Sequence, residues 1–287
     1  MSGAARIVDD EADPIAAQDF LEVIADPRAI INARHVAVIT AHPDDETIGC
    51  GALLARLRGV TAIVATDGAP RKDSGAKAHG FASAEAYAAA RARELDRALG
   101  LAKVDVADVV RLGIPDQQAA LSLAALSRTL AGVLRARQIT LMLTHAYEGG
   151  HPDHDATAFA VHAAAALMRR EGWELGIIEM PLYHLGENGM VVQRFPDGPE
   201  GLTISLDDET RVLKGRMVAA HQTQARMLSQ FPCEQERFRW APAYDFRHLP
   251  NRGRLLYEDH DWGMTGARWL VLAAEALADL GLEGAPA

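Results

Sequence analysis

Short runs of β-branched and other hydrophobic residues alternate with longer segments whose hydrophobic positions recur at helical spacing between residues 35 and 180. The runs predict buried strands, and the longer segments predict amphipathic helices. Strands that alternate with helices at this spacing form βαβ units, so we expect an α/β fold with a mainly parallel, Rossmann-like sheet and helices on both faces. The predicted strands cover residues 35–40, 61–66, 108–112, 139–144 and 176–180, and the predicted helices between them cover residues 46–57, 84–99, 122–137 and 152–170.

The pattern becomes irregular after residue 185. We expect a short hairpin or excursion, one long helix, a segment rich in Pro, Arg, aromatic residues and Gly that fits no regular element, and a closing helix. An acidic leader with one helix precedes the first strand, and a long polar loop, typical of a functional rim, follows the second. These segments are residues 187–205, 206–228, 231–266 and 269–280 after the sheet, 1–33 with a helix around 16–24 before it, and the loop 68–82.

One domain accounts for this organisation better than two. The sequence contains neither an internal repeat nor a low-complexity linker along its 287 residues. We therefore predict a single domain over residues 1–287, with the leader at 1–33, a core at 34–228 and a C-terminal cap region at 229–287.

Composition and charge restrict the partners and the compartment. A net charge of −10 argues against a general affinity for nucleic acid or anionic lipid. Cys50 and Cys233 lie far apart and provide no disulfide framework, which favours a reducing compartment. The N-terminal segment lacks the apolar core of a signal peptide, and no uninterrupted apolar stretch is long enough to span a bilayer. We expect a cytoplasmic protein that acts on a small molecule, without a nucleic-acid or membrane partner.

Two short stretches concentrate imidazoles and carboxylates at the ends of predicted strands. The first motif, AHPDDE at residues 41–46, follows the first strand, and the second motif, GGHPDHD at residues 149–155, follows the fourth. With the common strand order 3-2-1-4-5, strands one and four are neighbours, and a crevice opens at their carboxyl ends. The assumed order therefore predicts that the two motifs meet there.

Imidazole and carboxylate groups bind divalent ions, and three protein ligands with one open position is the catalytic arrangement for zinc. His42 and Asp45 can converge on one ion, with Asp44 beside the water that the ion activates. His151 and His154 share one face of a helix start, so that one binds the metal and the other faces the substrate; their spacing does not decide which. Either motif alone fits a turn or a helix terminus that favours negative charge. Two motifs in compatible positions favour a metal site.

The two motifs resemble those of the PIG-L/LmbE-like deacetylases, zinc-dependent enzymes that remove the N-acetyl group from glucosamine-type sugars. RAREL at residues 91–95 and GIPD at residues 113–116 are similar to further elements of that family. Lys214 with HQTQ at residues 221–224 is similar to a late element, with Thr223 in place of the usual serine. The resemblance covers roughly residues 35–228 and implies an LmbE-like fold with an irregular C-terminal portion.

The resemblance also implies the metal ligands and the catalytic base. It implies His42, Asp45 and His154 as ligands of Zn²⁺, a set that iron(II) accepts as well. It implies Asp44 as the general base that takes a proton from the attacking water.

Further roles follow from the second motif and the neighbouring elements. The resemblance implies that His151 stabilises or protonates the tetrahedral intermediate and that Asp153 orients His151. It implies Arg91 and Asp116 as contacts to the sugar. Tyr147 lies between the fourth strand and the second motif, which makes it a candidate substrate contact that donates to an oxyanion.

We therefore expect zinc-dependent hydrolysis of the N-acetyl amide of an amino sugar or glycoconjugate, with release of acetate. One alternative is an amidase of the same chemistry that acts on a larger thiol-sugar conjugate or another acylated metabolite. The other is a non-catalytic sugar-binding or nucleotide-binding module, which has no need of a base such as Asp44. Two other enzyme classes are disfavoured by the sequence. A Rossmann dehydrogenase is disfavoured because no glycine-rich turn follows the first strand. A two-metal phosphoesterase is disfavoured because the ligands suffice for one ion.

Overall fold

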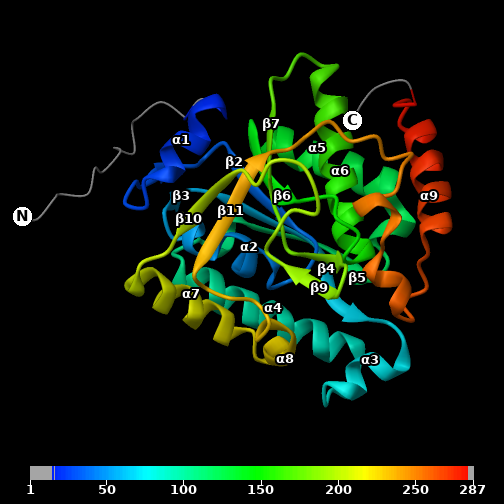
Figure 1. Ribbon diagram of the computed structural model, residues 1–287, viewed down its shortest axis with the longest axis horizontal. Coiled ribbons are helices and arrows are strands. Elements are labelled where there is room, and N and C mark those ends of the chain that lie inside the picture. Colours follow the sequence, from blue (N-terminus) through cyan, green and yellow to red (C-terminus); the bar gives the residue numbers. More distant parts are fainter. Residues whose placement is uncertain (1–14, 16, 284–287) are drawn as a thin grey trace, which may run out of the picture.

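The computed structural model describes residue 15 and residues 17–283, apart from the side chains of residues 73 and 74. A seven-stranded sheet with the order β10-β11-β7-β6-β2-β4-β5 lies at its centre (Figure 1). Its five parallel strands are the five predicted from the sequence, in the assumed order 3-2-1-4-5, so the fold-class prediction is confirmed. These strands are β2 (Val36–Thr40), β4 (Thr61–Pro70), β5 (Val109–Asp116), β6 (Leu141–His145) and β7 (Gly176–Met180).

Alternate side chains of β2 face two different cores, as expected for a strand covered on both faces. Val36 and Val38 belong to one hydrophobic cluster, whereas Ala37 and Ile39 belong to another. Helices α2, α4 and α7 pack against the first cluster, and α5, α6 and α9 pack against the second (Figure 1). These helices are α2 (Asp45–Leu54), α4 (Ala84–Leu101), α5 (Leu123–Ala136), α6 (Pro152–Arg169), α7 (Asp208–Ala220) and α9 (Gly266–Asp279).

Two helix starts follow from local side-chain chemistry. Ser83 caps α4, since its side chain accepts a hydrogen bond from the backbone N–H of Ala86, as its position predicts. Pro152 occupies the first turn of α6, where its missing N–H costs nothing, and His151 is the N-cap residue. The second motif is therefore fixed at the N-terminus of a buried helix.

The N-terminal third departs from the predicted boundaries in two places. The predicted helix 46–57 ends at Leu54, and the residues after it form a short strand that pairs with a segment of the leader. The predicted loop 68–82 is more ordered than expected, because β4 continues to Pro70 and a helix follows. The predicted leader helix exists over its described residues, while residue 16 lies outside them. These elements are η1 (Ala17–Asp19), α1 (Phe20–Ala25), β1 (Ile31–Asn32), β3 (Leu57–Arg58) and α3 (Asp73–Ala78).

The C-terminal third contains two sheet strands that the sequence pattern did not predict. β10 and β11 extend the sheet by antiparallel pairing beyond β7. β11 escaped prediction because Glu236 and Arg239 are buried in it as members of ion pairs, which breaks the apolar pattern. The hairpin begins earlier than expected, and the predicted helix 206–228 is interrupted at His221. The elements are β8 (Tyr183–Gly186), β9 (Gly189–Val192), β10 (Leu202–Ser205), η4 (Gln222–Gln224), α8 (Ala225–Leu228) and β11 (Gln235–Trp240).

Four short 3₁₀ segments complete the described elements. They are η2 (Val106–Asp108), η3 (Ala119–Ser122), η5 (Asn251–Gly253) and η6 (Leu256–Asp259).

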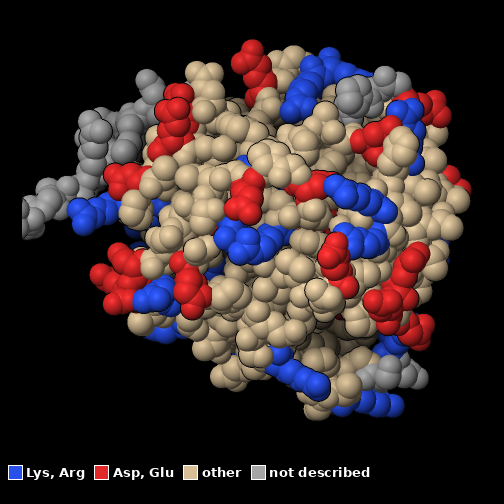
Figure 2. Space-filling model, viewed as in Figure 1, with Lys and Arg blue, Asp and Glu red and all other residues tan. Residues whose placement is uncertain are grey.

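Residues Ala119–Ala136 are long and apolar enough to span a membrane by length and composition, with a mean hydropathy of 1.2. The sequence pattern did not predict such a span. In the structure these residues form η3 and α5, whose apolar side chains pack on α6 and α9 as in a core helix. On the face drawn in Figure 2, acidic and basic side chains are interspersed.

Candidate metal centre

The two motifs meet at the carboxyl ends of β2 and β6, which are adjacent parallel strands. The first motif forms the turn from β2 into α2, and the second forms the turn that leads into α6. Both border a cavity of about 410 Å³. Of the predicted site residues, those that line this cavity are His42, Asp44, Asp45, Arg91, Asp116, His151 and His154.

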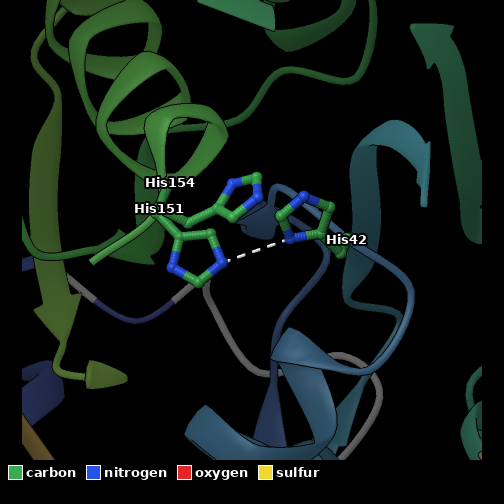
Figure 3. A group of neighbouring side chains, drawn as sticks. All are labelled: His42, His151 and His154. Atoms are coloured by element: carbon green, nitrogen blue, oxygen red, sulfur yellow. Dashed lines mark hydrogen bonds between the residues drawn. The ribbon is translucent and has the colours of Figure 1, made fainter. Parts of the chain in front are cut away.

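The side chains of the three predicted ligands approach one another closely, and Asp45 uses a different carboxylate oxygen toward each histidine. His42 Nδ1 lies 3.2 Å from His154 Nε2 and 3.3 Å from Asp45 Oδ2, and His154 Nε2 lies 3.4 Å from Asp45 Oδ1. In a tetrahedral zinc site with bonds of about 2.0–2.2 Å, ligand atoms stand roughly 3.3–3.6 Å apart. Figure 3 shows the rings of His42 and His154 approaching each other from the first motif and from α6. The donor set therefore fits a single divalent ion.

The tautomer of His42 suits this role. Its Nε2–H donates to Asp116 Oδ1 at 3.0 Å, and Asp153 Oδ2 lies 3.4 Å from the same nitrogen. The lone pair of Nδ1 is then directed at Asp45 and His154, since a carboxylate on one ring nitrogen fixes the other as a ligand. Burial lowers the pKa of His42, but the charges of Asp116 and Asp45 outweigh it and raise the pKa well above 6.5. A divalent cation on Nδ1 would replace that proton and would be favoured by the same carboxylates.

Two other imidazoles, those of His151 and His145, lie close enough to be considered as ligands. Donor atoms lie within 4.8 Å of one another in a group with His42, His151 and His154, and also in a group with Asp45, His145 and His154. The Nδ1 of His151 accepts the backbone N–H of Asp153 at 3.1 Å, so the neutral ring carries its proton on Nε2. The Nε2 of His145 accepts the backbone N–H of Ala41 at 2.7 Å. Neither ring offers a free lone pair toward the cluster, which leaves His42, Asp45 and His154 as the best ligand set.

Asp44 has an unusual backbone conformation beside these ligands. Its φ angle is 133°, a region that residues with a side chain rarely adopt. Its backbone N–H donates to Glu46 Oε2 at 3.1 Å, and its carbonyl accepts the N–H groups of Thr47 and Ile48. Burial raises the pKa of Asp44 to about 7, against the opposing effect of Arg91, whose guanidinium donates to its carboxylate at 3.0 Å. A buried carboxyl with a pKa near neutrality is suited to general base catalysis.

The hydrogen bonds of Asp153 differ from the predicted ones. Its carboxylate accepts the N–H groups of Gln117 and Ala119 and lies beside His42, and it lies in one cluster with His151 without a hydrogen bond to that ring. Only its backbone N–H contacts His151. Asp153 lies in the first turn of α6, and its carboxylate reaches the backbone of the residues that follow β5.

Two predicted sugar contacts, Arg91 and Asp116, make their hydrogen bonds to the site itself. Arg91 donates to the carbonyls of Pro43 and Gly68 as well as to Asp44, and Asp116 accepts from His42. Both still line the cavity, but their described contacts position the predicted base Asp44 and the predicted metal ligand His42.

Tyr147 does not line the cavity, which contradicts its predicted substrate contact. Its side chain is 4% exposed and packs in the core below α9. Its hydroxyl donates to the carbonyl of His248 at 3.1 Å and accepts from the indole of Trp269 at 2.6 Å. The tyrosine therefore has a structural role.

Other site residues were not predicted. The ring of His145 stacks on that of His154 at 4.3 Å, a contact that its position at the end of β6 could have indicated. The ring of Tyr183 also contacts that of His154, with 5.0 Å between the ring centroids. Trp262 lies 4.5 Å from the ring of His151. The last two come from distant segments, and no local pattern in the sequence connects them with the motifs.

A sequence model of the PIG-L family, described as GlcNAc-PI de-N-acetylase, matches residues 37–165. This segment contains both motifs and the three predicted metal ligands. No curated protein matches the chain.

Several solved structures share the fold. N,N′-diacetylchitobiose deacetylase from Pyrococcus horikoshii is 19% identical, with a TM-score of 0.54 over 82% of this chain and 92% of that one. A deacetylase of the antimicrobial A40926 pseudoaglycone is 20% identical, with a TM-score of 0.54 over 73% and 97%. The zinc-inhibited form of teicoplanin deacetylase is 18% identical, with a TM-score of 0.52 over 71% and 96%. The predicted family resemblance is confirmed, because residues 37–165 match the PIG-L family model and the fold is that of the named deacetylases.

Proposed function

We propose that this protein hydrolyses the N-acetyl amide of an amino sugar or glycoconjugate and releases acetate, with Zn²⁺ held by His42, Asp45 and His154. The short distances among these three side chains carry the proposal: His42 Nδ1 lies 3.2 Å from His154 Nε2, and each of these two nitrogens lies within 3.4 Å of one carboxylate oxygen of Asp45. The match to the PIG-L family and the similarity to named deacetylases support the choice of reaction. The free thiols of Cys50 and Cys233 support a reducing compartment, and we propose the cytoplasm.

A divalent ion in such a site supplies Lewis-acid chemistry, since it polarises a carbonyl oxygen and lowers the pKa of water. The chain supplies the proton transfers. With a pKa of about 7, Asp44 is partly ionised at neutral pH and takes a proton from the attacking water. Arg91 opposes the effect of burial on this pKa and so keeps the carboxylate available. Asp44 then holds the proton that the leaving amine requires.

His151 acts on the other side of the reacting amide. Burial and the charge of His42 hold its pKa well below 6.5, so the ring is neutral. The backbone N–H of Asp153 fixes its Nδ1 as an acceptor, which leaves Nε2–H as a donor. This N–H donates to the carbonyl oxygen as negative charge develops there, and such preoriented donors are strong contributors to catalysis.

Metal analysis combined with acetate release tests the proposal. The purified protein is stripped with a chelator, reloaded with Zn²⁺ or Fe²⁺, and offered N-acetylglucosamine, N,N′-diacetylchitobiose and larger N-acetylated glycosides. We expect about one metal ion per chain, as three ligands imply. Acetate release should disappear on chelation and in His154→Ala, and should persist in a control such as His248→Ala, whose side chain is exposed. A protein that binds sugar without metal and without turnover would instead support the binding-module alternative.

A further inference from the structure

One part of the cavity wall is apolar and is built by segments outside the PIG-L match. We call it the apolar wall, and it comprises Tyr183, Met190, Met227, Leu228, Phe231 and Leu256. The β8–β9 hairpin supplies two of these side chains, α8 supplies two, and the segments that follow α8 and β11 supply the others. Together with Ile48 and Leu182 they form a separate hydrophobic cluster.

The apolar wall begins directly at the reacting groups. The ring of Tyr183 contacts that of the ligand His154 at 5.0 Å and that of Phe231 at 6.0 Å. Ile48 joins the same cluster, and its N–H donates to the carbonyl of Asp44. A substrate group that extends from the metal centre past His154 and Tyr183 therefore meets hydrocarbon and aromatic surface, whereas Arg91 lies on the side of the Asp44 carboxylate.

The surroundings of His151 are different. Its Nε2 lies 3.9 Å from Asp116, and its ring lies against Trp262, whose indole stacks on the ring of His260. Gln117 lines the cavity as well. These groups offer hydrogen bonds and ring faces, which are the contacts that sugar hydroxyls and sugar rings make.

An amide that binds at the metal centre directs its two substituents to different parts of the cavity. If the amino sugar occupies the polar surroundings of His151, the acyl group extends along the apolar wall. The methyl group of an acetyl would cover only a small part of six side chains. Met190 and Met227 are half-buried, so part of their surface remains open for a ligand.

We infer that the apolar wall is an acyl subsite for alkyl chains longer than acetyl, an inference that rests on the proposed amide hydrolysis. Each methylene that leaves water contributes to binding, and several methylenes fit along a wall of this extent. The substrate class is then an amino sugar with a short or medium-length fatty acyl group on its nitrogen.

The test uses the zinc-loaded protein and a series of N-acetyl-, N-butanoyl-, N-hexanoyl- and N-octanoylglucosamine. All four release the same amine, so kcat/KM can be compared from one assay. We expect kcat/KM to rise by roughly tenfold or more from acetyl to hexanoyl, as burial of a few methylenes implies. Met227→Gln and Met190→Gln keep the side-chain length but add a polar amide, and each should reduce this ratio. Val212→Gln, at an exposed position on α7, is the matched control and should leave the ratio unchanged.

Equal kcat/KM values for all four acyl chain lengths would overturn the inference. A second arm compares the methyl and octyl glycosides of N-acetylglucosamine, and a gain confined to the octyl glycoside would also overturn it, because the wall would then hold the aglycone. If the zinc-loaded protein hydrolyses none of these substrates, the result contradicts the proposed function instead. In that case calorimetric binding still decides: tighter binding of N-hexanoylglucosamine than of N-acetylglucosamine, lost in Met227→Gln, supports the subsite, and equal binding overturns it.

Discussion

Residues 37–165 and residues 183–262 build opposite kinds of surface around one cavity. The earlier region supplies the charged groups: both motifs, Arg91 and Asp116 come from the ends of parallel strands or from the helices beside them. The later region supplies most of the apolar lining, from a hairpin, a one-turn helix and irregular segments. The contrast suggests that chemistry is tied to the sheet edge, where position is fixed, and that substrate preference is tied to the elements added around it.

The later region also stabilises helix α2 of the earlier region through α7 and β11. Helix α2, which begins with a predicted metal ligand, is kinked at Cys50, where the backbone leaves helical geometry. Glu236 of β11 accepts the N–H groups of Ala52 and Leu53 just beyond the kink. Lys214 of α7 donates to Glu236 and to the carbonyl of Ile48 just before it. A buried ion pair therefore satisfies the backbone groups that the kink leaves open.

The largest expected effect is at Asp44, the proposed general base in the earlier region. Asp44→Ala should lower kcat by up to about 10⁴-fold, because general base catalysis contributes about 10²–10⁴. Metal content, measured by mass spectrometry, should remain. Asp44→Asn serves as a second variant, since asparagine tolerates positive φ better than alanine. Asp45→Ala should lose metal and activity together. Unchanged turnover in both Asp44 variants would remove this residue from the mechanism.

The contacts of Lys214 and Glu236 with α2 should contribute to the free energy of unfolding. Lys214→Met leaves the carboxylate of Glu236 buried without its cation, and we expect a loss of about 3–5 kcal/mol in the free energy of unfolding. Urea denaturation measures it. The exposed pair of Arg128 and Asp279 is the control, and Arg128→Met should cost less than about 1 kcal/mol. Equal losses of unfolding free energy in the two variants would show that the buried Lys214–Glu236 pair contributes no more to stability than the exposed pair.

The donor role of His151 gives a smaller effect on rate. His151→Asn keeps a side-chain acceptor at the N-cap of α6 but removes the Nε2–H donor. We expect kcat to fall by about 10²–10³, as for other donors to a developing oxyanion. His248→Ala is the control, because that imidazole is exposed. A variant that loses metal as readily as His154→Ala would show that His151 is a ligand and not a donor.

Much of this division could be predicted from local sequence signals. The parallel strands follow from periodicity, and the meeting of His42 with His154 follows from the motifs at strand ends once the common strand order is assumed. The cap by Ser83 follows from its residue type. The burial of Tyr147 and the direction of Asp153 did not follow, because each depends on which neighbour the turn leading into α6 places beside it.

The apolar wall was beyond prediction for a related reason. Its members are spread over more than seventy residues and share no spacing. Each resembles an ordinary core residue until the fold assembles the cavity. β11 was missed for the opposite reason, since its buried Glu236 and Arg239 resemble surface residues in the sequence. Local patterns predict elements well, but they carry little information about long-range pairing of charges.

The smallest expected effect concerns the junction between the two regions. Glu148, just before the second motif, accepts the N–H groups of Leu182 and Tyr183 at 2.9 and 3.0 Å, where the apolar wall begins. Burial raises the pKa of Glu148 well above 4.5, and these two hydrogen bonds oppose the shift only in part. The folded state therefore retains a proton that the unfolded chain releases as the pH rises above about 4.5.

It follows that this carboxyl favours folding at low pH and that its contribution is lost as the pH rises toward its raised pKa. The loss proceeds at up to about 1.4 kcal/mol per pH unit. Glu148→Gln keeps one carbonyl oxygen as an acceptor and does not titrate. Relative to the wild type, the variant should thus be more stable at pH 7 than at pH 5 in urea denaturation. A difference between variant and wild type that is independent of pH would show that Glu148 is already ionised in the fold. The two regions would then be joined by a charged contact and not by a neutral one.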